Sequence, residues 1–253
     1  MLPFSSISFI YFMAAAIGLM VAWKFLLKSV LPYKTVIFII SVSFLVFYPS
    51  PIQLIFFTLY SYGILRLSVI TLKGNKKLWM TLLALIPMLL MKLDLNDKIY
   101  QFAGLSYITF RTVQSIVDTN SKEKLMNFMD FSSFVLFTPT LLIGPIDRSD
   151  RFQSNLNDSS SFNTDRFVSG LDFLLKGALY KFIFAAIVYD YWLEDVDNTH
   201  IGGHINYMYA YTVYLFFDFA GYSALAVGFG KCLGIEVPIN FDKPFLAQNP
   251  GDF

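Results

Sequence analysis

The sequence has little charge, one cysteine and two histidines. Only 15% of its 253 residues are Asp, Glu, Lys or Arg, whereas soluble domains contain about 25%. Nineteen basic and eighteen acidic residues leave a net charge of +1, so the chain carries no basic field that would attract nucleic acid. The single cysteine, Cys232, excludes a disulfide framework and a multi-cysteine metal site. These shortages exclude a nucleic-acid-binding domain and a small disulfide-rich domain.

Apolar and aromatic residues are abundant instead. Hydrophobic residues make up 56% of the chain, which contains 28 Phe and 15 Tyr, and this composition excludes disorder. Residues 1–23 carry no charge and are long enough to cross a hydrocarbon core of about 30 Å. No Lys or Arg precedes this stretch, so it does not have the pattern of a cleavable signal peptide. We therefore predict an all-α integral membrane protein that crosses the bilayer several times.

Further apolar stretches follow along the chain. Residues 35–65 are uncharged but interrupted by Pro49-Ser50-Pro51, which predicts two spans joined by a tight turn because proline cannot sit in a helix interior. The remaining stretches are residues 78–91, which predict a tilted or partial span, residues 171–189, and residues 205–229.

One apolar stretch has an unusual content of helix-breaking residues. Residues 131–146 include Pro139, Gly144 and Pro145. This composition favours a broken or re-entrant segment over a straight helix. The sequence shows no internal repeat and no second domain, so we expect one membrane domain over residues 1–253.

The charges between the spans indicate an orientation. One group of lysines follows the first predicted span and a second group follows the third. Both groups fall on the same side of the membrane if the turn at Pro49-Ser50-Pro51 lies on the other. The positive-inside rule then predicts that this side is cytoplasmic and that the N-terminus lies outside. The lysines are Lys24, Lys28, Lys34, Lys73, Lys76 and Lys77.

An aspartate stands near the middle of the last apolar stretch. Asp218 would cost about 2.5–3.5 kcal/mol at the centre of a membrane helix. Four tyrosines share its helix face at spacings of three or four residues, and we expect this stripe to face the protein interior or a wet cavity. We favour a structural, hydrogen-bonded contact between helices over direct participation in a reaction. The tyrosines are Tyr207, Tyr211, Tyr214 and Tyr222.

Four other charged residues adjoin or interrupt apolar stretches. Arg111 and Arg148 each follow one, and Lys176 and Lys181 lie within residues 171–189. For an isolated cation the simplest interpretation is that its side chain snorkels to the membrane interface. We adopt that interpretation for the two lysines.

The two histidines have the spacing of a helical metal-binding pair. Gly202-Gly203 lies between His200 and His204, and each glycine costs about 1 kcal/mol in a helix. The pair is therefore predicted to lie in a loop, and the sequence shows no third ligand. We predict no metal site.

Three segments together resemble the membrane-bound O-acyltransferase family. They are Gly104–Gln114, Thr138–Arg148, and Tyr214–Ser223 followed by Asn240-Phe241 and Pro244-Phe245. The first two are most similar to the branch of the family that attaches D-alanine to teichoic acids. The alginate O-acetyltransferases share the third segment and usually differ at the first two.

The resemblance implies a multi-pass enzyme in the plasma membrane of a Gram-positive bacterium, with broken helices around a central funnel. The family takes an acyl thioester from the cytoplasmic side, here D-alanine on the phosphopantetheine arm of a carrier protein. It passes the acyl group to an outer hydroxyl of lipoteichoic acid or of a relay membrane protein. The family uses a histidine as its presumed general base. No bound cofactor is expected.

The sequence departs from the family at the catalytic histidine. In the family this residue follows a pattern that Asn249–Phe253 matches here, and neither His200 nor His204 occupies its position. We therefore expect this chain to be the N-terminal part of such an enzyme and to be inactive alone. The matched residues, to which we assign tunnel-lining or structural roles, are Tyr107, Arg111, Arg148, Tyr214, Asp218, Tyr222 and Asn240.

Two alternatives stay open at this point. One is an O-acetyltransferase of an exported polysaccharide, and the other is a non-catalytic membrane scaffold. A transporter is a more distant possibility, because the paired repeats typical of transporters are missing from the sequence.

Overall fold

In the part of the chain that the computed structural model describes, the regular secondary structure is helical. That part comprises residues 7–48, 51–70, 76–92, 104–119, 125–141, 144–158, 160, 162–194, 196, 200–241, 246 and 248–249. Within these residues there is no strand, which confirms the predicted all-α class.

The first half of the chain forms the helices α1 (Ile7–Ala22), which continues as a π-helical turn (Trp23–Leu27), α2 (Tyr33–Ser43), α3 (Pro51–Ile70), α4 (Lys76–Lys92) and α5 (Leu105–Asp118). Three short helices follow: α6 (Phe128–Val135), α7 (Thr138–Leu141) and α8 (Ser149–Asn157). The last part contains α9 (Thr164–Ala178), α10 (Ala185–Val188) and α11 (Ile201–Cys232), and π-helical turns at Leu179–Phe184 and Tyr189–Leu193 flank α10.

Among the described residues, three helices are long and apolar enough to cross a membrane. They cover Ser8–Leu27, Pro51–Val69 and Ile201–Cys232. The predicted division of residues 35–65 is confirmed, because one helical stretch ends at Phe47 and α3 begins at Pro51. Proline is well suited to the first position of a helix, where its missing N–H would have no partner anyway.

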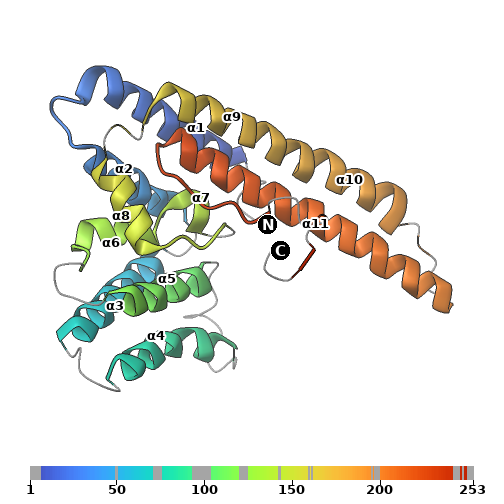
Figure 1. The fold of residues 1–253 in the computed structure, drawn as a ribbon, viewed down its shortest axis with the longest axis horizontal. Helices are drawn as coiled ribbons and strands as arrows, with labels where there is room; N and C mark the ends of the chain where they lie inside the picture. The colour runs from blue at the N-terminus through green and yellow to red at the C-terminus, as the bar shows by residue number, and fades with distance from the viewer. Residues whose placement is uncertain are drawn as a thin grey trace.

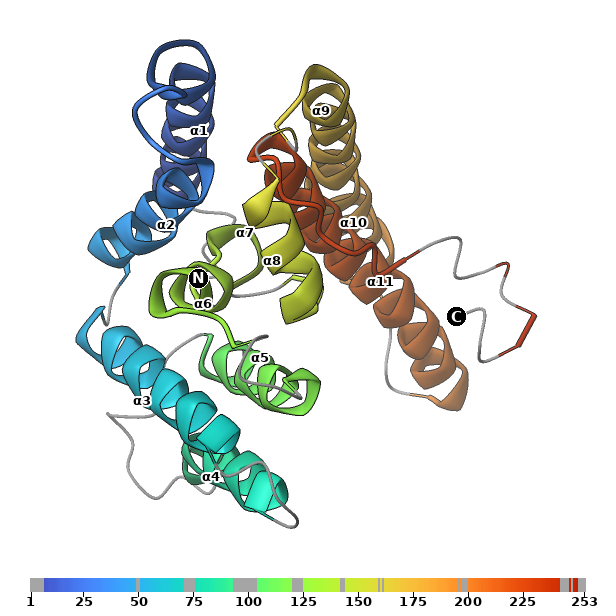
Figure 2. The ribbon, with the colours of Figure 1, turned by 60° about the vertical axis from the view of Figure 1, so that its left-hand side comes forward.

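The helices form two groups with short helices between them. In Figure 1, α9–α10 and α11 run side by side along the upper edge, and α3, α4 and α5 pack together below. Helices α6, α7 and α8 lie between the two groups, as the rotated view in Figure 2 also shows, and α7 packs against α11. The C-terminal end of α1 and the N-terminal end of α4 lie on the same side of the molecule (Figure 1), as the lysine pattern requires.

The predicted break in residues 131–146 is confirmed. Helix α6 ends at Val135, α7 contributes only Thr138–Leu141, and residues 144–148 are not helical. The side chains of both short helices are largely buried. This burial is expected because non-helical backbone is tolerated at membrane depth only where protein or water surrounds it.

The long antiparallel pair of α9–α10 and α11 is built on glycines. A methyl group at Gly177 would lie 2.8 Å from the backbone nitrogen of Leu225, and one at Gly228 would lie 2.8 Å from that of Leu174. Gly170 and Gly221 are equally crowded by the facing helix. Small residues let two helices approach closely, which is the usual basis of tight helix packing in membranes.

The apolar stretch at residues 171–189 lies within a longer helical run from Thr164 to Leu193 that contains two π-helical turns. One expectation about this region needs correction. The predicted loop around the histidines is wrong, because α11 begins at Ile201 and the backbone N–H of His204 donates to the carbonyl of His200 at 3.1 Å. The start of α11 is largely exposed, and most of the buried residues of this 32-residue helix lie at positions 220–232. The helix extends across Gly202 and Gly203 because adding residues to an existing helix costs less than starting one.

The glycine contacts make a testable prediction. Gly177→Ala and Gly228→Ala should each lower the free energy of unfolding by about 1–3 kcal/mol, because the added methyl group overpacks the helix interface. The measurement is unfolding in mixed detergent micelles, followed by tryptophan fluorescence. Gly63→Ala in α3 is the control: a methyl group there meets nothing within 4 Å and should cause no loss. Equal losses in all three variants would contradict the close contact.

Candidate functional site

The first two motif segments meet at Arg111. This residue lies in α5 and is only 1% exposed. Its Nη1 donates to the carbonyls of Phe134 (2.7 Å) and Val135 (3.1 Å), and its Nη2 donates to the carbonyl (2.8 Å) and the hydroxyl of Thr140. The carbonyls at the end of α6 have no partner within their own helix. Arg111 therefore does not snorkel to the interface; it joins α5 to both pieces of the broken segment.

Tyr107 and Gly144 extend this junction by one turn. The Tyr107 hydroxyl is hydrogen-bonded to the backbone of Gly144, and the charge of Arg111 acts on it. A methyl group at Gly144 would lie 2.7 Å from the Cα of Thr140, so only glycine fits there. Side chains of the first motif segment, residues 104–114, thus bond to backbone groups of the second, residues 138–148.

Asp147 supplies the negative charge of the junction. It is 3% exposed, and its Oδ1 accepts from the Arg148 backbone N–H (2.7 Å) and from Arg151 Nε (2.6 Å). Burial raises the pKa of the Asp147 carboxyl, while the hydrogen bonds and the charges of Arg151 and Arg111 oppose that rise. Among the described residues, Arg111 Nε and Asp147 Oδ2 are buried without a hydrogen-bond partner. The junction therefore keeps one N–H donor and one carboxylate oxygen without a hydrogen-bond partner in the described part of the chain.

Asp218 pairs with Lys181 across the antiparallel helix pair. The two side chains are 18% and 14% exposed and form a hydrogen-bonded ion pair. The Lys181 ammonium also lies 3.9 Å from the centroid of the Tyr222 ring. The snorkelling interpretation of Lys181 is therefore wrong. The opposite charge compensates the cation inside the protein, and the structure pairs Asp218 with Lys181 rather than with Arg148.

The other motif residues occupy varied positions. Tyr222 is buried and Tyr214 is half-buried, with its ring 5.6 Å from that of Tyr189. Arg148 and Asn240 are exposed. Tyr207 and Tyr211 stack on each other with ring centroids 6.0 Å apart but are 38% and 44% exposed. The prediction that the stripe faces the protein interior is therefore correct only for its members nearer the C-terminal end of α11. Pro244 and Phe245 lie outside the described residues.

A cavity of about 330 Å³ adjoins the third motif segment. It lies between α9, α11 and the chain that follows α11, and its polar lining residues include Lys176 and Ser223. The aromatic walls are formed in part by Tyr180, Phe216 and Phe241. Lys176 therefore lines a cavity, which the sequence did not indicate. In the described part of the chain, no group of three His, Cys, Asp or Glu residues is placed to hold a metal ion.

Comparison with known proteins identifies relatives of two kinds. No family profile matches the chain. The chain is 39% identical over 160 residues to a teichoic acid D-alanyltransferase of Bacillus subtilis, covering 60% of this chain and 40% of the relative. It is 36% identical over 187 residues to a teichoic acid D-alanyltransferase of Streptococcus thermophilus, covering 68% and 45%. A probable alginate O-acetylase of Pseudomonas aeruginosa is 30% identical over 155 residues, covering 59% and 29%.

These matches confirm the resemblance to the membrane-bound O-acyltransferase family, whose members include both kinds of relative. The identity to the D-alanyltransferases is higher than that to the O-acetylases. The chain spans less than half the length of the D-alanyltransferases that it matches.

Arg111 and Arg148 provide a matched test of the junction. Arg111→Leu should lower the free energy of unfolding by about 2–4 kcal/mol, because it leaves several buried carbonyls without a donor. Arg148→Leu removes an exposed side chain from the same family pattern and should change stability by no more than about 0.5 kcal/mol. Thermal unfolding in detergent is the measurement. Similar stabilities for the two variants would refute the bracing role of Arg111.

The Lys181–Asp218 pair can be tested by a double-mutant cycle. Lys181→Met and Asp218→Asn should each destabilise the protein by about 3 kcal/mol, because each strands a partly buried charge, and the double variant should recover part of the loss. The control pair is Asp172 and Lys176, two exposed residues of α9, for which Asp172→Asn and Lys176→Met should combine additively. Additive losses at Lys181 and Asp218 would show that the two charges do not interact.

Proposed function

We propose that this chain forms part of a membrane O-acyltransferase that attaches D-alanine to lipoteichoic acid at the plasma membrane of a Gram-positive bacterium. The similarity to teichoic acid D-alanyltransferases carries the proposal. It is supported by the packing of the matched segments around one interior region, in which α5 contacts α6 and α7 through Arg111 and α7 contacts α11.

The proposed reaction transfers an acyl group from a carrier protein to an acceptor hydroxyl. The donor is D-alanine held as a thioester on the phosphopantetheine arm of a carrier protein, and the acceptor is a hydroxyl of lipoteichoic acid or of a relay membrane protein. The carbon–sulfur bond of the thioester breaks, a carbon–oxygen bond to the acceptor forms, and the hydroxyl proton ends on the released thiol. Such a transfer across a bilayer needs a polar path through an apolar layer, which broken helices enclosed by protein can provide.

We assign the described residues structural roles in this reaction. Arg111 holds the broken segment in place, and the ion pair of Lys181 and Asp218 fixes α11 against its neighbour. We assign neither histidine a catalytic role. His200 precedes α11 and His204 lies in its first turn, and Figure 1 places that end of α11 away from α5–α8. The general base is therefore expected in the part of the relatives that this chain does not match.

An O-acetyltransferase of an exported polysaccharide is the second candidate. The 30% identity to alginate O-acetylases supports it. The two candidates differ in donor and acceptor, so a single assay distinguishes them. A non-catalytic membrane scaffold would show neither activity.

The assay compares membranes of the source organism with those of a strain in which the sequence encoding this chain is deleted. We expect the deletion to lower D-alanyl esters on lipoteichoic acid more than tenfold and to leave O-acetyl esters on exported polysaccharide unchanged. Loss of the O-acetyl esters instead would support the second candidate, and loss of neither would support the scaffold. Membranes that contain only this chain, supplied with charged carrier protein, should form no D-alanyl ester. Ester formation there would overturn the expected inactivity of the chain alone.

A further inference from the structure

A cavity of about 400 Å³ opens where α1 ends and α2 begins, on the side of the molecule that carries the basic residues. Its walls come from the end of α1, the turn at residues 28–34 and the last turn of α8. The polar lining residues are Lys28, Lys34 and Asn157, and the largest apolar ones are Trp23 and Tyr33.

The aromatic walls of this cavity are fixed by hydrogen bonds. Trp23 Nε1 donates to the carbonyl of Leu31 at 2.7 Å, and the Tyr33 hydroxyl donates to the carbonyl of Leu233 at 2.9 Å. Their ring centroids lie 5.4 Å apart, and the two residues are 2% and 3% exposed. The rings therefore form a rigid floor, and the ammonium groups of the two lysines are the adaptable donors above it.

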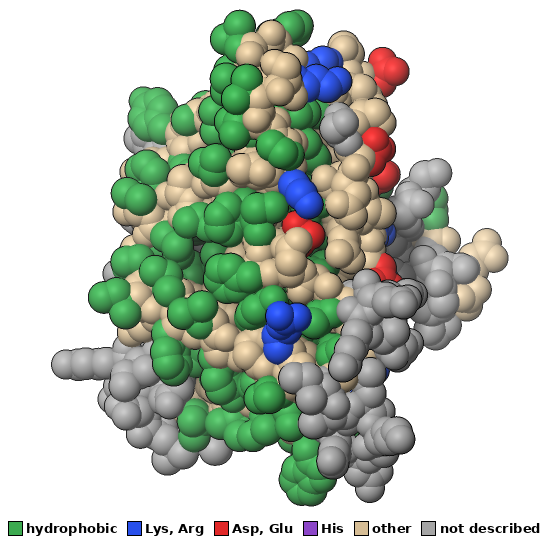
Figure 3. Space-filling view, turned by 90° about the vertical axis from the view of Figure 1, so that its left-hand side faces the viewer, with side chains coloured by type: hydrophobic (Ala, Val, Ile, Leu, Met, Phe, Trp, Pro, Cys, Tyr) green, Lys and Arg blue, Asp and Glu red, His purple; other side chains and the backbone are tan. Residues whose placement is uncertain are grey.

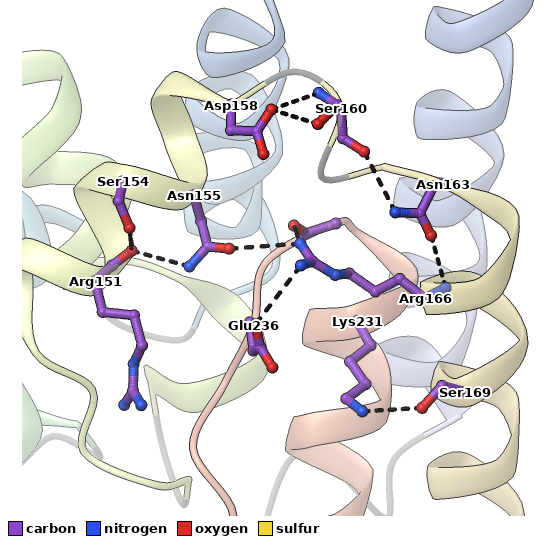
Figure 4. A network of polar contacts seen from close by, with 11 residues as sticks. Arg151, Ser154, Asn155, Asp158, Ser160, Asn163, Arg166, Ser169, Lys231 and Glu236 are labelled. Carbon is purple, nitrogen blue, oxygen red and sulfur yellow. Dashed lines mark hydrogen bonds and ion pairs between the residues drawn. The ribbon is translucent and has the colours of Figure 1, made fainter.

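The carboxylates nearby already have partners. Figure 4 shows Asp158 accepting from the backbone N–H and the hydroxyl of Ser160, and Glu236 paired with Arg166 at 3.6 Å. Asp130 acts electrostatically on Lys34 while its Oδ2 accepts from Asn127. Lys28 is exposed, and no ion pair is found for it within the described residues. These hydrogen bonds leave Asp158 and Asp130 charged, but neither residue lines the cavity. The charged side chains that line it are those of Lys28 and Lys34, both cations.

The position of the cavity points to the membrane surface. The apolar span Ser8–Leu27 ends one residue before Lys28. Tryptophan and tyrosine are enriched at this level of a bilayer, and basic residues there attract anionic lipids. Figure 3, which views this side of the molecule, shows Lys and Arg side chains set among hydrophobic ones.

The surroundings distinguish a lipid from a soluble anion. Phe25 and Leu26 are each 75% exposed and Val30 is 72% exposed, and all three alternate with the basic residues along the same turn. An anionic head with hydrocarbon chains would use the lysines and these apolar side chains together, whereas free phosphate would use the lysines alone. We infer that the Lys28–Lys34 cavity binds the phosphate headgroup of an anionic membrane lipid. This inference does not depend on the proposed acyl transfer.

The test uses the whole chain in phosphatidylcholine nanodiscs that contain increasing amounts of brominated phosphatidylglycerol. Trp23 lines the cavity, and its fluorescence is quenched by a bromine atom nearby. With Trp79→Phe and Trp192→Phe as background, Trp23 is the only tryptophan. We expect selective quenching by the anionic lipid. Lys28→Gln and Lys34→Gln should each weaken its apparent affinity about fivefold.

Lys24→Gln is the matched control, because Lys24 lies on the same helix end but over the ring of Phe162 in a neighbouring groove. It should weaken the affinity less than twofold, and an equal effect would overturn the site in favour of general attraction to the basic surface. Soluble inorganic phosphate or glycerol phosphate should not displace the lipid. Displacement by either, or by an acidic carrier protein at micromolar concentration, would overturn the assignment to a lipid. Lys28 is exposed, so its variant remains informative if the Lys34 variant folds poorly.

Discussion

A helix that breaks inside a membrane must find new partners for its backbone, and the arrangement around Arg111 follows from that requirement. Each unsatisfied carbonyl or N–H in hydrocarbon costs several kcal/mol. Arg111 supplies donors from a straight helix to the ends of two short ones. Its guanidinium is suited to this because it presents five N–H groups in a rigid plane and stays protonated. The charge that it brings into the interior is compensated in part by Asp147, which is itself held by Arg151.

In the long helix pair, too, buried charged groups are compensated by partners inside the protein. Gly177 and Gly221 bring the two backbones close together, and Lys181 and Asp218 follow within one turn on the two helices. Because the backbones are close, the two charged side chains meet without stretching and each compensates the burial of the other. The aromatic side chains beyond them, such as Phe216, are then left to form the wall of the adjoining cavity. The cavity thus lies beside the close contact, because its lining residues on the two helices fall within residues 173–180 and 216–227.

Features with a local physical cause could be predicted from the sequence. The division at Pro49-Ser50-Pro51 and the break near Pro139 follow from the missing N–H of proline. A single proline does not always break a helix, however, because Pro87 lies inside α4. Features that depend on tertiary packing could not. Whether Arg111 snorkels or is buried depends on which helix face meets protein, and one helix sequence does not reveal that. Gly170 and Gly177 are seven residues apart, as are Gly221 and Gly228, and this equal spacing fixes the register in which Lys181 faces Asp218. The register can be derived from the sequence only once the two helices are known to be antiparallel neighbours. The helical start of α11 across two glycines depends in the same way on the rest of the chain, because it extends a helix whose packed part lies further on.

Charges in this protein differ in what surrounds them, and that difference limits what each can do. Arg111, Asp147, Lys181 and Asp218 are enclosed with opposite charges or carbonyls, so a change in protonation of any one would strand its partner. Such groups suit a framework that must keep its shape while a flexible donor and acceptor pass, and they do not suit the proton exchange that acyl transfer requires. Lys28 and Lys34 stand at the membrane edge with apolar side chains beside them and no carboxylate bonded to them among the described residues. The charge of Lys28 is therefore available to a group from outside the protein, whereas that of Lys34 also acts on the Asp130 carboxyl.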